Sequence, residues 1–168
     1  MLPSSINFAP STSEIDIQRT SNGRSKITFR NTDALTIRTD NPFVRDASCG
    51  YTTFSVYLPK KPCKTAIGFS FCQNSAECHK YMTPAYSSGG LYVSFGGAGF
   101  IYPSQERAVR GYGEGDTVRA SCDFSSNVVN FFVNGASVAA APLDTAACLV
   151  YPSISCERGV AVIETWFE

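Results

Sequence analysis

Residues 115–135 read GDTVRASCDFSSNVVNFFVNG, and this stretch decides the fold. Apolar and polar residues alternate through 117–124, which puts one side chain of every two on the same face of a strand. The apolar run VVNFFV over 128–133 follows and ends at Asn134-Gly135. Asn-Gly between two apolar runs favours a β-hairpin, because both central residues of its turn need positive φ. The stretch therefore predicts antiparallel strands with one buried face, and Cys122 is predicted on that face.

Similar signals recur along the rest of the chain, where short alternating or apolar runs are broken by Gly, Pro, Asn and Ser. No useful length of sequence has the helical period. About eleven strands are expected on this pattern. They lie at residues 27–30, 34–39, 51–58, 65–72, 91–96, 98–102, 117–124, 128–133, 136–141, 148–156 and 160–168. Many short strands with frequent turns indicate an all-β fold, here an antiparallel two-sheet β-sandwich.

The length of 168 residues favours one domain. Residues 1–25 are rich in Ser, Thr and Asn, and we expect a short extended N-terminal arm that packs partly on the sandwich. The sandwich itself is predicted over residues 26–168. Residues 73–90 form the longest irregular stretch, and loops of that length in compact domains are commonly functional or disordered.

The charges are balanced, with 14 basic and 14 acidic residues. Proteins that bind nucleic-acid backbones usually carry a basic excess, so nucleic acid is not the expected partner. No apolar run approaches the ~18 residues of a membrane span. The opening residues MLPSSINFAP resemble neither a secretory signal nor a mitochondrial presequence. A cytoplasmic location is therefore predicted, with a nuclear or cytoskeletal complex as the alternative.

Catalytic and metal chemistry have weak support. The chain has 7 cysteines, an odd number that argues against a disulfide framework. Its single histidine follows a cysteine directly, and adjacent residues on an extended loop point in opposite directions, which disfavours a Cys–His catalytic pair. The same segment also lacks the short Cys-x2–4-Cys spacing of structural zinc sites. We therefore expect a protein that is not an enzyme and has no cofactor or metal. The residues considered for these roles are Cys63, Cys72, Cys78 and His79.

Two binding alternatives stay open. Four lysines gather in the loop regions 60–64 and 80, where a solvated loop face is the simpler interpretation and RNA contact the alternative. A carbohydrate-binding sandwich is the other alternative, since such sites stack a sugar on an exposed aromatic ring. The only tryptophan, Trp166, lies in the last predicted strand, where we expect it to be buried.

Five blocks of the sequence, in this order and spacing, resemble the strands of SPRY domains. The blocks are Gly50-Tyr51-x-x-Phe54-x-Val56, Ala66-Ile67-Gly68-Phe69, Gly115-Asp116-x-Val118-x-Ala120-x-Cys122-Asp123-Phe124, Val129-x-Phe131-Phe132-Val133-Asn134-Gly135 and Leu149-x-Tyr151-Pro152-x-Ile154-Ser155. The resemblance covers roughly residues 27–168. It implies a bent β-sandwich that is a non-enzymatic protein-interaction module, either an adaptor or a subunit of a larger complex.

The resemblance also implies a partner-binding surface made by loops at one end of the sandwich. Where known peptide-binding members have an apolar loop with a Trp, this chain has Glu157-Arg158, so their preference for Asn-rich peptides is not expected here. Instead, Arg158 suits a carboxylate and Tyr81 an apolar or aromatic side chain. The residues that correspond by register are Thr39, Asp40, Asn41, Pro42, Tyr81, Glu157 and Arg158.

Overall fold

The computed structural model describes residues 8–9, 14–20, 22–31, 34–45, 51–60, 64–71, 92–145, 147–157 and 159–168. Every regular element in these ranges is a β-strand, and each predicted strand segment overlaps one of them. The strands are β1 (Phe8–Ala9), β2 (Ile15–Arg19), β3 (Ser25–Asn31), β4 (Leu35–Thr39), β5 (Phe43–Val44), β6 (Tyr51–Tyr57), β7 (Thr65–Ser70), β8 (Tyr92–Gly96), β9 (Phe100–Tyr102), β10 (Glu106–Arg107), β11 (Thr117–Asp123), β12 (Val128–Val133), β13 (Ala136–Pro142), β14 (Leu149–Cys156) and β15 (Gly159–Phe167).

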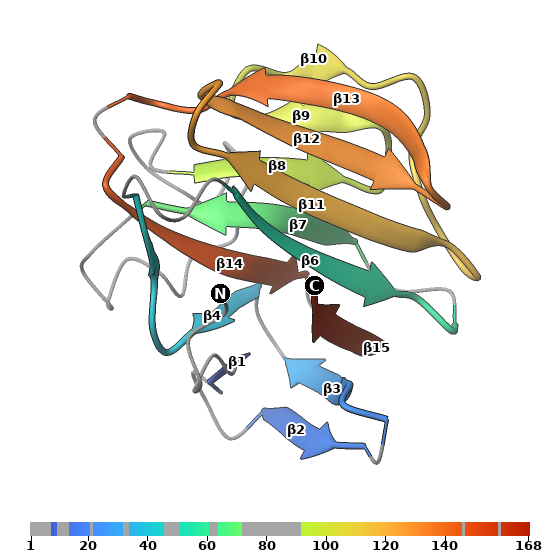
Figure 1. The fold of residues 1–168 in the computed structure, drawn as a ribbon. Helices are drawn as coiled ribbons and strands as arrows, with labels where there is room; N and C mark the ends of the chain where they lie inside the picture. The colour runs from blue at the N-terminus through green and yellow to red at the C-terminus, as the bar shows by residue number, and fades with distance from the viewer. Residues whose placement is uncertain are drawn as a thin grey trace.

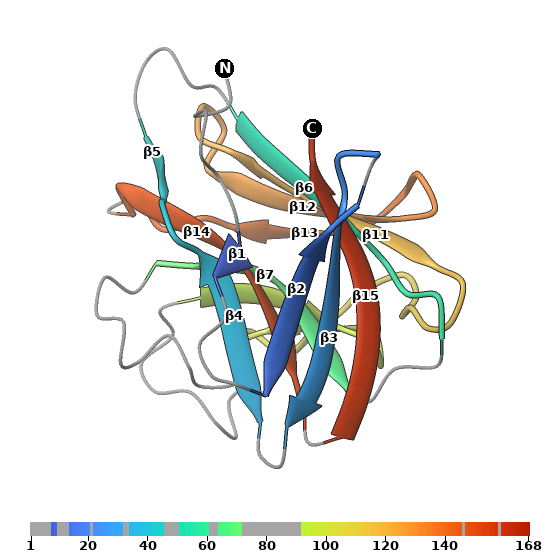
Figure 2. The ribbon, with the colours of Figure 1, turned by 90° about the horizontal axis from the view of Figure 1, so that it is seen from below.

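These strands form two antiparallel sheets that face each other as a sandwich (Figure 1, Figure 2). The seven-stranded sheet has the order β13-β12-β11-β6-β15-β3-β2, which runs from top to bottom in Figure 1. The eight-stranded sheet has the order β1-β4-β14-β7-β8-β9-β10, with β5 paired to β14 outside this path. The prediction of an all-β, two-sheet antiparallel sandwich is therefore confirmed.

The core lies between the sheets and is built from the inward face of each strand. Phe54 of β6 and Phe69 of β7 are fully buried and meet edge to face across the sandwich, with ring centroids 5.5 Å apart. Burying one such side chain stabilises a fold by roughly 1.5–3 kcal/mol. Cys122 has no exposed surface, so its predicted place on the buried face of β11 is confirmed.

The hairpin between β12 and β13 has the predicted turn. Asn134 has φ of 51° and Gly135 has φ of 84°. Positive φ at both positions is the geometry that an Asn-Gly turn supplies at low steric cost. This turn brings β13 to the edge of the seven-stranded sheet.

Strand β7 is buried on both faces, because all six of its residues are buried between its neighbours β14 and β8. A continuously apolar run is typical of such a central strand. At Gly68 the backbone of β8 lies so close that an added Cβ would come within 2.0 Å of the Val93 carbonyl oxygen. Glycine is therefore required at this position for the two strands to pair.

Two features differ from the sequence prediction. The structure adds the short strands β1, β2, β5 and β10, of which β1 and β2 lie within residues 1–25 and pair with β4 and β3. The division into an arm over 1–25 and a sandwich over 26–168 stays a prediction. The expected burial of Trp166 was wrong, because Trp166 pairs with Ser55 on the outer face of its sheet and is only half-buried.

Candidate functional site

Hydrogen bonds tie three loops together at one end of the sandwich, which we call the Asp40 end. It comprises residues 40–45, 123–127 and 143–145 with 147–148. The Arg45 N–H donates to the Cys148 carbonyl at 2.8 Å, and the Leu143 N–H donates to the Asn127 carbonyl at 2.8 Å. These bonds fix the loops to one another, as a rigid binding surface requires.

The Arg45 side chain is the centre of the Asp40 end. Its Nε donates to the Ala147 carbonyl at 2.9 Å, and its Nη2 donates to the Asp144 carbonyl at 3.2 Å. Its Nη1 donates to the Phe124 carbonyl at 3.3 Å and also to Asn127 Oδ1. One guanidinium therefore contacts two other loops, which uses the fork of donors that distinguishes arginine from lysine.

The segment Thr39–Val44 crosses this end and has a turn at Asp40 and Asn41, between β4 and β5. Thr39 is fully buried, and its hydroxyl donates to the Asn41 carbonyl at 2.8 Å, so its side chain supports the turn from beneath. Asp40 and Asn41 are exposed, and the Asn41 N–H donates to Asp40 Oδ1 at 3.0 Å. Val44 follows on the edge strand β5 with half of its surface exposed (50%). The turn thus presents polar side chains beside an exposed aliphatic one.

Arg38 and Tyr151 lie beneath the start of this turn. The Arg38 guanidinium carbon is 3.8 Å from the centre of the Tyr151 ring. The two residues come from the paired strands β4 and β14. This cation–π contact anchors the end of β4, from which the turn departs.

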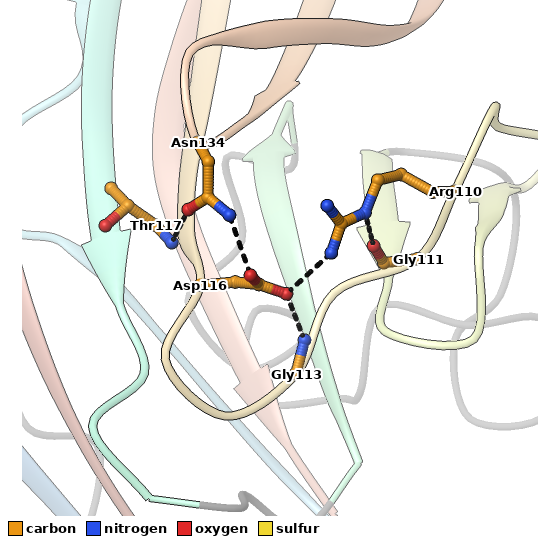
Figure 3. Close-up of polar contacts among 6 residues, drawn as sticks. All are labelled: Arg110, Gly111, Gly113, Asp116, Thr117 and Asn134. Atoms are coloured by element: carbon orange, nitrogen blue, oxygen red, sulfur yellow. Dashed lines mark hydrogen bonds and ion pairs between the residues drawn. The ribbon is translucent and has the colours of Figure 1, made fainter.

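A second group of loops lies at the other end of the same strands, which we call the Asp116 end: residues 58–60, 97–99, 111–116 and 134–135, with Glu157. Figure 3 shows its polar centre. Asp116 Oδ1 accepts a hydrogen bond from Asn134 Nδ2 at 2.8 Å, and Asp116 Oδ2 accepts one from the Gly113 N–H at 2.9 Å. Arg110 Nη2 is 3.1 Å from Asp116 Oδ2. Asn134 Oδ1 in turn accepts from the Thr117 N–H at 2.9 Å.

These contacts change the titration of Asp116. Burial opposes ionisation of its carboxyl group, but the hydrogen bonds from Asn134 and Gly113 and the charge of Arg110 outweigh it. The pKa of Asp116 is therefore held below its ordinary value. The Gly-Asp and Asn-Gly motifs thus act together as a structural lock between the 111–116 loop and the β12–β13 hairpin.

The structure separates the residues predicted for one binding surface. In the register of β4 with β14, Arg38 pairs with Ser153 and Leu35 pairs with Cys156. Asp40 therefore follows one end of this pair of strands and Glu157 follows the other, about 20 Å away at the usual rise per residue. Asp40, Asn41 and Pro42 are together at the Asp40 end, whereas half-buried Glu157 donates its N–H to the Lys64 carbonyl at 2.8 Å. Tyr81 and Arg158 lie outside the described residues.

The residues weighed for other chemistry are only partly described. Cys63, Cys72, Cys78 and His79 lie outside the described ranges, and within those ranges no three His, Cys, Asp or Glu side chains group as metal ligands. Of the described cysteines, Cys122 and Cys156 are buried and Cys148 is exposed. Lys60 and Lys64 are exposed. In the described part of the chain, no helix is long and apolar enough to cross a membrane.

The arrangement of strands is similar to that of two solved structures. The crystal structure of the SPRY domain of human HERC1 superposes with a TM-score of 0.64 over 96% of each chain, at 14% sequence identity. The chain has the SPRY fold. A second human SPRY domain matches with the same TM-score of 0.64, at 13% identity and over 96% of each chain. No protein-family model and no curated protein matches the sequence. The expected SPRY fold is thus confirmed by structure where the sequences have diverged widely.

Proposed function

We propose that this chain is a non-enzymatic protein-interaction module, an adaptor or a subunit of a larger complex, that binds a peptide or a partner surface through the loops of its Asp40 end. The SPRY fold supports this class of function, because SPRY domains are generally protein-interaction modules. A cytoplasmic location belongs to the same proposal.

One observation carries the choice of surface: an exposed turn adjoins loops that a single half-buried guanidinium, that of Arg45, holds in place. Binding loses less conformational entropy when the contacting loops are already ordered. Arg45 orders the loops beneath the turn through its hydrogen bonds to Ala147, Phe124 and Asp144. Asp40 and Val44 then offer an exposed charge and an exposed apolar side chain within the same segment.

The same proposal includes Asn41 and Pro42, which share the turn, and Tyr81, Glu157 and Arg158 as residues carried over from the family. Because Glu157 lies at the Asp116 end, it would contact only a partner that extends over the side of the sandwich. We therefore expect substitutions at Asp40 and Val44 to weaken binding more than Glu157→Ala.

Affinity capture from native lysate tests this proposal. The wild-type chain is compared with the double variant Asp40→Lys/Val44→Asp and with a matched control pair away from the Asp40 end, Glu114→Lys at the Asp116 end with Val109→Asp in the segment before it. The control pair makes the same kinds of change at exposed positions, since Glu114 is exposed and Val109 has 84% of its surface exposed. Melting temperatures verify that all three proteins are folded.

We expect a specific partner with the wild type and the control pair, and its loss with Asp40→Lys/Val44→Asp. Capture by the Asp40-end variant, with loss in the control pair, would contradict the proposal and move the interface to the surface around Glu114 and Val109. A third arm with Tyr81→Ala/Arg158→Ala asks whether those two residues contribute to the same interface.

The partly exposed Trp166 does not favour carbohydrate binding as a second function. The Arg24 guanidinium carbon lies 3.8 Å from the centre of the Trp166 ring, so one face of that ring is already covered. A stacked sugar would have to displace it.

A further inference from the structure

A row of four side chains crosses the middle of the outer face of the seven-stranded sheet. The register pairs Phe132 with Arg119, Arg119 with Ser55, and Ser55 with Trp166. The row thus runs across the neighbouring strands β12, β11, β6 and β15, which can be followed in Figure 1. Phe132, Arg119 and Trp166 are half-buried, and Ser55 is buried between them.

Each aromatic ring of this row carries a guanidinium. The guanidinium carbon of Arg119 is 4.2 Å from the centre of the Phe132 ring, and that of Arg24 is 3.8 Å from the centre of the Trp166 ring. The sheet face therefore presents planar cations stacked on aromatic rings, with the small Ser55 between the two stacks. Stacking fixes the plane of a guanidinium and leaves its edge donors available.

The two arginines differ in their charge balance. Arg24 has a carboxylate 3.7 Å away, on Glu164. Within the described part of the chain, the Arg119 guanidinium stacks on the Phe132 ring and has no carboxylate in ion-pair range and no hydrogen-bond acceptor. The Glu168 carboxylate accepts a hydrogen bond from Ser55 Oγ, in the middle of the row, at 3.3 Å.

A half-buried guanidinium with five N–H donors and an aromatic ring on one side is complementary to a carboxylate, which can accept two of those donors at once. We propose that this row, from Phe132 to Trp166, is a second docking surface, and that it binds an acidic extended segment of a partner protein. A Glu or Asp side chain of that segment pairs with Arg119, and apolar side chains two residues before and after it, on the same face of the extended segment, pack on the edges of Phe132 and Trp166. The surface lies on a sheet face, apart from the loops of the Asp40 end, and does not depend on them.

Trp166 makes this proposal directly measurable, because it is the only tryptophan in the chain. The probe is a short synthetic peptide in which Val lies two residues before and two residues after a single Glu, so that all three side chains share one face of an extended chain, and its control is the same peptide with Gln in place of that Glu. We expect the Glu peptide to change the fluorescence of Trp166 in a saturable way and the Gln peptide to bind at least about tenfold more weakly. The affinity for the Glu peptide should fall as salt is raised.

Arg119→Gln should weaken binding of the Glu peptide about tenfold or more, and Arg119→Lys should lie between it and the wild type, since lysine keeps the charge but not the fork. The matched control is Arg107→Gln. Arg107 is exposed and also stacks on an aromatic ring, with its guanidinium carbon 5.1 Å from the centre of Phe100, but it lies in β10 of the other sheet. This variant should bind like the wild type. If Arg119→Gln does not fold, Arg119→Lys against Arg107→Lys gives the same comparison.

Four results would overturn the proposal: no fluorescence response of the wild type to the Glu peptide, equal affinity for the Glu and Gln peptides, unchanged binding by the Arg119 variants, or equal weakening by Arg119→Gln and Arg107→Gln. A response to a single-stranded oligonucleotide but not to the Glu peptide would also overturn it and would favour a phosphate ligand. Loss of binding at the Asp40 end leaves these outcomes unaffected, so the two surfaces are tested separately.

Discussion

At the scale of single residues, burial separates the described cysteines by role. Cys122 sits in the core opposite Thr52 and Val129, with no exposed surface, whereas Cys148 is exposed at the Asp40 end. We expect Cys122→Ser to lower the free energy of unfolding by about 1–3 kcal/mol, because desolvating a hydroxyl in the core costs more than desolvating a thiol. Cys148→Ser should stay within ~0.5 kcal/mol of the wild type. Urea denaturation measures both, and equal effects would contradict the assignment of the strand faces.

Arg45 is the second residue whose role is sharply defined. We expect Arg45→Met to lower the free energy of unfolding by roughly 1–3 kcal/mol, because the carbonyl groups of Ala147, Phe124 and Asp144 lose a charged donor. Arg107→Met removes an exposed arginine that stacks on a ring only, and it should have a much smaller effect. Denaturant titration of the two variants compares them. A small effect of Arg45→Met would mean that the loops of the Asp40 end hold their shape without it.

At the scale of elements, the lock between the 111–116 loop and the β12–β13 hairpin predicts a pH dependence. The pKa of Asp116 is lowered in the folded protein, so its ionised form stabilises the fold above the pKa of the unfolded state. That stabilisation is lost as the pH falls through the lowered pKa. We expect the wild type to lose more stability than Asp116→Asn between about pH 6 and pH 2. Parallel curves of unfolding free energy against pH for the two proteins would refute this role.

The elements also show what sequence patterns can and cannot predict. The hairpin at Asn134-Gly135 and the central strand β7 were predicted because local turn chemistry and a continuous apolar run determine them. Trp166 shares a strand face with Glu164 and Glu168, so the alternation within β15 already indicates its outward side, and the expectation of burial overlooked this pattern. Strand β2 was missed because its sequence IDIQR has only two apolar residues. Its strand conformation depends on backbone hydrogen bonds to β3, which lie outside the segment itself.

The candidate site was predictable only in part for the same reason. Asp40, Asn41 and Pro42 follow directly from the end of a predicted strand. The separation of Glu157 from them follows from the antiparallel pairing of β4 with β14, which is a long-range feature. Arg45 carried no signal in the sequence, because all its acceptors come from segments far along the chain.

At the scale of the whole molecule, the sandwich presents three distinct surfaces. The Asp40 end is ordered by Arg45, the Asp116 end is closed by the lock of Figure 3, and the outer face of the seven-stranded sheet carries Arg119. We propose that a protein partner binds at the first of these surfaces. A rigid scaffold of paired strands separates the ends, so protection on binding should be confined to the surface that the partner covers.

Hydrogen–deuterium exchange of the chain, free and in complex with its captured partner, tests that claim most directly. We predict slower exchange in the complex for amides of residues 40–45, with those of residues 111–116 unchanged. Slower exchange over residues 111–116 and 134–135, with residues 40–45 unchanged, would contradict binding at the Asp40 end and place the partner at the Asp116 end.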